Sequence, residues 1–248
     1  MIVTAAICPS PPLLARELTG RAEILPELRV ACAAAVTSLL AAAPDVIAIV
    51  GTGQETATWN PDDRLDLSAY GLLLPTTPQA THRPVSADPA APPGSAAGPR
   101  GKPGLPLALG VGALLLDQAR YAGPRILQAV DESASSADCL RLGRDLAGAA
   151  PRVALLAVGD GSTRRGPAAP GYFDERALPF DDAVQRAVRD GDMTALARLD
   201  PDLARDLMAT GRAAWQVLAG AFAGARPATE ISYAADPFGV AYLVATLT

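Results

Sequence analysis

Three short apolar runs, each followed by a loop rich in proline or glycine, constrain the fold of this chain most strongly. They cover residues 2–8, 45–50 and 152–158. Apolar runs of this length, bounded by such residues, are typical of strands that are buried on both faces of a sheet. The runs therefore predict the centre of a sheet that other elements cover on both sides.

Segments with helical spacing separate these runs, so strands and helices alternate along the chain. We expect helices over 27–42, 107–118, 134–149, 181–190, 192–199, from 201 onward and over 208–222. We expect further strands over 125–130, 229–234 and 239–247. This alternation predicts an α/β fold with an open, mostly parallel or mixed central sheet and helices on both faces. The 248 residues fit one domain, 1–248, with a long Pro/Gly/Ala-rich loop over 75–106.

Charge and hydropathy exclude two classes of partner. The chain has 26 Asp and Glu against 21 Lys and Arg, and no basic run exceeds two residues, so we expect no nucleic acid partner. The first ten residues lack the positive charges of a signal peptide, and no apolar stretch approaches the roughly 20 residues that span a bilayer. We therefore predict a cytoplasmic protein without a membrane partner. The three cysteines form no CxxC pair and are expected to be reduced and mostly buried.

Polar loops follow the three apolar runs, where ligands of such sheets collect. In the loops at 51–56 and 160–165, backbone N–H groups, the hydroxyls of Ser162 and Thr163, and a guanidinium from Arg164 or Arg165 would cradle an anionic or polar ligand. The alternative is that Asp160 and Ser162 only cap a turn and that the arginines pair with nearby acids. The loop at 51–53 lacks the Gly-Lys-Ser/Thr ending of a nucleotide P-loop, and the glycines at 110 and 112 lack the third glycine of the dinucleotide fingerprint. No GxSxG motif indicates a serine hydrolase.

The motifs after these runs occur in an order that is similar to one known family. Pro9-Ser10-Pro11-Pro12-Leu13 follows the first run, Gly51-Thr52-Gly53 the second, and Gly159-Asp160-Gly161-Ser162-Thr163-Arg164 the third. Ala169-Pro170-Gly171-Tyr172 comes next, and the segment 232–242 lies near the end. Together they resemble the class III extradiol ring-cleavage dioxygenases of the LigB type and their Memo-like relatives, over nearly the whole chain.

The corresponding family motifs contain histidines that this chain lacks. They read Pro-His-Pro-Pro-Leu, Ser-Pro-His and Gly-Asp-Leu-Ser-His-Arg. Carried over position by position, the first histidine falls at Ser10 and the second at Gly53, or at Gln54 if the loop shifts by one residue. The acid/base histidine falls at Thr163, and the family carboxylate at Ala234.

The resemblance implies an iron(II) ion held by two histidines and a carboxylate, with another histidine as acid/base, acting on a catechol and dioxygen. A serine hydroxyl is a poor iron ligand at neutral pH, a glycine has no side chain, and threonine does not shuttle a proton near pH 7 as imidazole does. One carboxylate, Asp236, stands two residues from Ala234. The sequence therefore predicts a dioxygenase fold without its iron ligands, its catalytic histidine or a cofactor.

Other residues offer two ways to rebuild a metal site. His82, the one histidine of the chain, lies in the Pro-rich stretch and would have to be delivered by it. Cys8 shares a strand face with Ser10, so a cluster of Cys8, Asp160 and Asp236 is a weak alternative metal site. A metal-free catalyst that uses Asp160 is a further alternative. In either case the protein would be an oxidoreductase or a dioxygenase-related enzyme with a rebuilt, non-histidine site.

We favour a noncatalytic member of this superfamily that binds a small polar ligand or a protein partner in its cleft. The family resemblance also implies a homodimer. The residues that we expect to line the ligand-binding cleft are Ser10, Gly53, Gln54, Asp160, Ser162, Thr163, Arg164 and Asp236.

Overall fold

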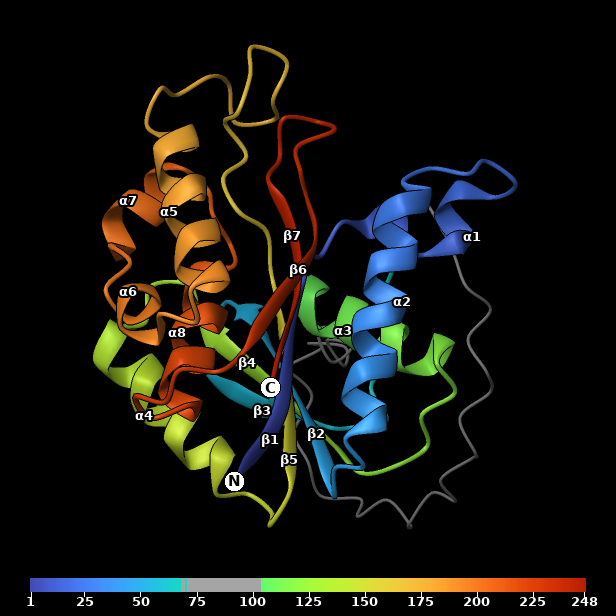
Figure 1. Ribbon diagram of the computed structural model, residues 1–248. Coiled ribbons are helices and arrows are strands. Elements are labelled where there is room, and N and C mark those ends of the chain that lie inside the picture. The colour runs from blue at the N-terminus through green and yellow to red at the C-terminus, as the bar shows by residue number, and fades with distance from the viewer. Residues whose placement is uncertain (68–69, 71–103) are drawn as a thin grey trace, which may run out of the picture.

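The structure, a computed structural model, describes residues 1–67, 70 and 104–248. The described residues form a seven-stranded sheet in the order β3-β4-β2-β5-β1-β7-β6 (Figure 1). The four strands β4, β2, β5 and β1 are parallel, β3 pairs antiparallel with β4, and β7 pairs antiparallel with both β1 and β6. The strand bounds are β1 Ile2–Cys8, β2 Val46–Gly53, β3 Ala57–Trp59, β4 Arg125–Asp131, β5 Val153–Val158, β6 Thr229–Ala235 and β7 Tyr242–Leu247.

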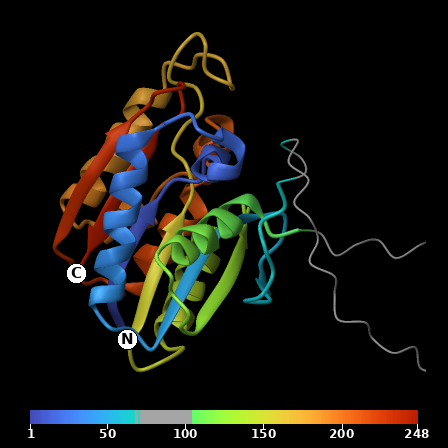
Figure 2. The same ribbon diagram turned by 90° about the vertical axis from the view of Figure 1, so that its right-hand side faces the viewer.

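Helices cover both faces of the sheet. The first face carries α2 and α3, and the second carries α4 to α8 (Figures 1 and 2). No helix in the described part of the chain is long and apolar enough to cross a bilayer. The helix bounds are η1 Pro12–Leu14, α1 Arg16–Thr19, α2 Pro26–Ala41, α3 Leu107–Gln118, α4 Ser136–Ala147, α5 Ala177–Arg189, α6 Met193–Ala197, α7 Pro201–Asp206 and α8 Arg212–Ala221.

Burial on both faces explains the apolar runs. All six residues of β5 are buried, and so is every residue of β1 from Thr4 on. Side chains alternate between the two cores: Ala5 and Ile7 of β1 pack under α4 to α8, whereas Ala6 and Cys8 pack under α2 and α3. The predicted α/β fold, with a mixed sheet between two helical layers, is confirmed.

Several elements differ from the sequence-based prediction: α5 begins at Ala177 rather than 181, β2 continues to Gly53 rather than ending at 50, and η1 and α1 were not expected. The helix expected over 208–222 begins only at Arg212, because Met208 adopts a left-handed φ of 54° that interrupts a helix. The last strand begins at Tyr242 rather than 239, because Gly239 has a φ of 72° in a turn. Strand β3 was not expected at all. Residues 75–103 of the loop predicted over 75–106 lie outside the described part of the chain.

Two glycines bring helices α4 and α8 into close contact on the second face. A Cβ atom at Gly143 would lie 2.0 Å from the carbonyl oxygen of Val217, and one at Gly220 would lie 2.3 Å from that of Leu140. Real Cβ atoms do not approach backbone atoms so closely. At each glycine, the backbone of the other helix therefore occupies the space that a side chain would need. Helix α8 is therefore held tightly by α4, and the loop before α8 is held with it.

The connections leave a crevice at the carboxyl ends of three central strands. The chain leaves β1 and β2 toward helices α2 and α3 on the first face, but leaves β5 toward α5 on the second face. Strand β5 lies between β2 and β1. Because neighbouring loops diverge to opposite faces here, this is the position at which open α/β sheets bind ligands.

Candidate functional site

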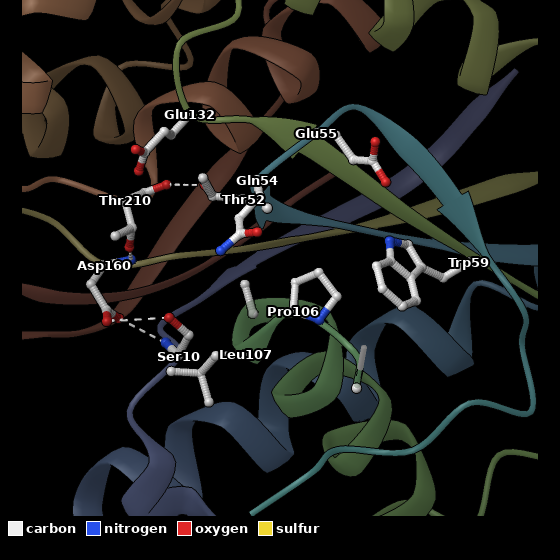
Figure 3. Close-up of a pocket in the computed structure, with 13 residues that line it drawn as sticks. Ser10, Thr52, Gln54, Glu55, Trp59, Pro106, Leu107, Glu132, Asp160 and Thr210 are labelled. Carbon is white, nitrogen blue, oxygen red and sulfur yellow. Dashed lines mark hydrogen bonds between the residues drawn. The ribbon is translucent and has the colours of Figure 1, made fainter. Parts of the chain in front are cut away.

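A cavity of about 840 Å³ opens at the carboxyl ends of β1, β2 and β5 (Figure 3). Its volume is within the range of small-molecule sites. The loops after the three apolar runs supply part of its wall, and the start of α3 and the segments after β4 and before α8 supply the rest. The lining residues are Ser10, Thr52, Gly53, Gln54, Glu55, Trp59, Gly104, Pro106, Leu107, Ala108, Glu132, Asp160 and Thr210.

Ser10 and Asp160 form a polar contact in the wall of this pocket. The backbone N–H of Ser10 donates to Oδ1 of Asp160 at 2.7 Å, and the Ser10 hydroxyl donates to Oδ2 at 3.2 Å. Ser10 is almost completely buried, whereas Asp160 is half-buried and reaches the cavity (Figure 3). The contact joins the end of β1 to the end of β5, which are paired strands.

The carboxyl group of Asp160 titrates close to neutral pH. Burial raises its pKa to about 6, although the two hydrogen bonds from Ser10 act in the opposite direction. Burial raises the pKa of Tyr242 on β7, and the negative charge of Asp160 raises it further. No arginine or lysine of the described residues forms an ion pair with Asp160. Asp160 therefore faces the pocket as a carboxyl group that forms no ion pair within the described part of the chain.

This raised pKa predicts that Asp160→Asn stabilises the protein at neutral pH. The native state holds the Asp160 proton more tightly than the unfolded chain, so this group's contribution to stability is present below about pH 4 and is lost as pH rises to about 6. We expect a loss of about 2 kcal/mol by pH 7, allowing for solvent at the half-buried carboxyl. Asparagine can accept the Ser10 N–H through Oδ1 and donate to the Ser10 hydroxyl through Nδ2, and it does not titrate.

Urea unfolding at pH 4.5 and 7.5 measures this effect. The variant should gain stability relative to the wild type as pH rises, by about 1.3 kcal/mol between the two conditions, because part of the loss has already occurred at pH 4.5. Glu230→Gln, which also replaces a carboxylate by an amide but at an exposed position on β6, is the control for the loss of one charge. Parallel pH profiles for Asp160→Asn and the wild type would show that Asp160 has an ordinary pKa.

Thr210, which precedes α8, fastens the ends of β2 and β5 together. The Thr52 hydroxyl donates to the Thr210 carbonyl oxygen, and the Thr210 hydroxyl accepts the Asp160 N–H at 3.1 Å. The next N–H, that of Gly211, donates to the Asp160 carbonyl oxygen at 2.8 Å. The position of α8 therefore sets the position of Asp160.

Four predicted cleft residues do line the pocket: Ser10, Gly53, Gln54 and Asp160. The prediction for Ser162 is wrong, because its side chain is fully buried and its hydroxyl donates to Asp181 at 2.5 Å. Although Ser162 is only two positions from Asp160, its side chain points away from the cavity and stabilises the loop.

The arginines and Asp236 do not form the predicted cradle either. Arg165 pairs with Asp181 at 3.4 Å and with Asp236 at 3.1 Å, as the alternative interpretation of these arginines expected. Neither Arg164 nor Asp236 is among the lining residues, and Thr163 lines a neighbouring cavity of about 340 Å³. An anion-binding role for this loop in the 840 Å³ pocket therefore has no cationic side chain to support it.

The residues at the family's iron positions do not fit an iron ion. The hydroxyl proton of Ser10 is engaged by Asp160, and a Cβ atom at Gly53 would lie 3.0 Å from Cβ of Ala129 and 3.3 Å from Cγ of Pro106. A ligating side chain thus has little room at residue 53. Within residues 1–67, 70 and 104–248, no three His, Cys, Asp or Glu side chains are grouped as metal ligands.

The alternative metal cluster is also not assembled. Cys8 is fully buried beside Cys32, and the hydrogen bond between them together with burial raises the pKa of the Cys8 thiol. Asp236 pairs with Arg165. The structure therefore does not group the side chains of Cys8, Asp160 and Asp236 as ligands of one metal ion. His82 lies outside the described residues.

Other lining residues were not expected from the sequence. Glu132 follows β4 and shares the strand-end position of the other loops, so the same rule would have found it. Thr210 and Trp59 carry no local signal, since one precedes a helix far along the chain and the other lies on the unexpected β3.

Comparison with known proteins supports the fold alone. Neither a protein-family model nor a curated protein sequence matches this chain. Among solved structures, the chain is similar to an uncharacterized protein, JW3007, from Escherichia coli K12, with 16% sequence identity, 99% coverage of both chains and a TM-score of 0.52. The α/β architecture of this chain thus recurs over its whole length in that protein.

Proposed function

We propose that this protein is a noncatalytic member of the LigB-like superfamily that binds a small polar molecule in the 840 Å³ pocket. The proposal rests on where two residues lie. Ser10 and Gly53, which stand where the family resemblance places two iron ligands, both line this pocket. The pocket thus retains the place of the family's active site, while the residue types that perform the chemistry are replaced.

The chemistry of the remaining donors supports a binding role. Ser10 and Asp160 satisfy each other, and Gly53 leaves no space for a larger ligating group. Two neutral imidazoles and a carboxylate on one face of the ion are what make an iron(II) dioxygenase site. A hydroxyl and one carboxylate do not supply that donor set.

Metal titration and oxygen uptake test the loss of catalysis. Full-length protein mixed anaerobically with ferrous salt and then desalted should retain far less than one iron per chain. With catechol and air it should consume oxygen no faster than buffer containing the same iron. Stoichiometric iron together with catechol-dependent oxygen uptake would overturn the noncatalytic part of the proposal.

Blocking the pocket tests the binding role. Gln54 is exposed at the pocket wall, so Gln54→Trp should narrow the cavity without disturbing the core. Small polar compounds that raise the melting temperature of the wild type should lose that effect in Gln54→Trp and keep it in Glu230→Gln. Equal shifts in both variants would place binding elsewhere.

The near-neutral pKa of Asp160 favours a second candidate, a metal-free acid/base catalyst. A carboxyl group with a pKa of about 6 is suited to proton transfer near physiological pH, and the Ser10 hydroxyl lies 3.2 Å from it. In that case Asp160→Asn should lower turnover by a factor of 100 or more, while ligand affinity changes much less. Equal turnover in the variant and the wild type would remove this candidate.

A further inference from the structure

Among the described residues, the charged side chains that line the pocket all have one sign. Three carboxylates line it, those of Glu55, Glu132 and Asp160, and the described lining residues include no Arg, Lys or His. No ion pair of the described residues involves any of the three. By contrast, Asp181 and Asp236 near the same strand ends both pair with Arg165. The pocket therefore concentrates negative charge that this part of the chain leaves uncompensated.

Part of the wall across from Asp160 is apolar, although Glu55 lies on the same side (Figure 3). Figure 3 shows Trp59 and Pro106 on the opposite side of the pocket from Asp160 and Ser10. Leu107, at the start of α3, also lines the pocket and lies beside Ser10 in Figure 3. An apolar wall with an indole accommodates a hydrocarbon or aromatic body, and a cation near the indole face gains additional electrostatic attraction.

The depth of the three carboxylates differs in a way that suits a cation entering from solvent. Glu55 and Glu132 are exposed at the rim, whereas Asp160 is half-buried and fixed by Ser10. Rim charges mainly attract and orient a charged partner, and a fixed, less hydrated charge contributes more to its affinity.

The indole N–H of Trp59 is buried without a hydrogen-bond partner in the described residues, so the apolar wall also leaves one donor unsatisfied.

We propose that the pocket binds an organic amine, with the protonated ammonium group at Asp160 and Glu132 and an apolar or aromatic body along Pro106, Leu107 and Trp59. This inference rests on the proposed function, since it names the ligand class of the same pocket. An ammonium group supplies the positive charge and the donors that the carboxylates lack. A carboxylate or phosphate ligand would meet three like charges.

Three probes of similar shape separate charge from shape: benzylamine, benzyl alcohol and benzoate. Binding to the full-length protein at pH 7.5 is followed by Trp fluorescence and by calorimetry. We expect benzylamine to bind at least 10-fold more tightly than benzyl alcohol and benzoate not to bind. Raising NaCl from 50 to 500 mM should weaken benzylamine binding, because salt screens the attraction of the exposed carboxylates.

Matched variants assign the effect to the carboxylates. Asp160→Asn and Glu132→Gln should each weaken benzylamine binding about 10-fold and leave benzyl alcohol unchanged, whereas Glu230→Gln should change neither. Thermal melts verify that each variant is folded. If benzyl alcohol or benzoate binds as well as benzylamine, and Gln54→Trp abolishes that binding, the amine inference fails while the binding role stands. If Gln54→Trp affects no compound that binds, both fail.

Discussion

Replacing Gly143 with alanine is expected to lower the free energy of unfolding by about 3 kcal/mol. The new Cβ would lie 2.0 Å from the Val217 carbonyl oxygen and 2.6 Å from the Ala221 backbone nitrogen. Both contacts are with backbone, so α4 and α8 must move apart, and forced separation of a packed interface costs about 1–3 kcal/mol or more. Alanine gains about 1 kcal/mol of helix propensity, which does not offset a clash with main-chain atoms.

Gly148 provides a matched control at the end of the same helix. A Cβ there would meet only the Asp145 carbonyl oxygen at 3.5 Å and the Arg144 carbonyl oxygen at 3.9 Å, which are ordinary contacts. Gly148→Ala should therefore keep the wild-type melting temperature to within about 2 °C, while Gly143→Ala should melt about 6–12 °C lower. If Gly143→Ala melts with the wild type, the close approach of α4 and α8 is wrong.

The same variant also links stability to the pocket. Helix α8 carries Thr210 and Gly211 just before its start, and these two residues hold the backbone of Asp160. A displaced α8 should loosen that hold. Gly143→Ala is therefore expected to weaken pocket binding although residue 143 lies outside the pocket, and Gly148→Ala is not.

Much of the fold could be predicted because burial on both faces leaves a direct mark on the sequence. The residues of β5 are uniformly apolar, and α3 was predicted with the bounds that the structure gives it. Strand β3 escaped because it is three residues long and exists only through pairing with β4. Its residues alternate only once between partly buried and exposed, which is too short a pattern to separate from a loop.

The site could be predicted as far as strand ends determine it. The rule that ligands collect at carboxyl ends found Ser10, Gly53, Gln54 and Asp160. It did not say which way each side chain turns beyond the strand. Ser162 follows Asp160 by two residues but turns into the protein, because its N–H and hydroxyl both donate to the buried Asp181. That partner lies on α5, and no local pattern links it to the loop.

Asp181→Ala is expected to lower the free energy of unfolding by about 3 kcal/mol. The Asp181 side chain is 3% exposed and accepts the Ser162 N–H at 2.9 Å and the Ser162 hydroxyl at 2.5 Å. Alanine would leave both donors buried without an acceptor, at a cost of about 1–3 kcal/mol, and would deprive Arg165 of its buried partner. Chemical denaturation measures the loss.

Asp181→Asn separates the hydrogen bonds from the charge. Burial raises the pKa of Asp181 although Ser162 and Arg165 oppose that shift, so the ionised form is costly to keep in this position. Asparagine can accept the Ser162 N–H, and Arg165 keeps its contact with Asp236. We therefore expect Asp181→Asn to cost about 1 kcal/mol or less. If asparagine were as damaging as alanine, the ion pair with Arg165, rather than the acceptor for Ser162, would hold this loop and the adjacent Asp160 in place.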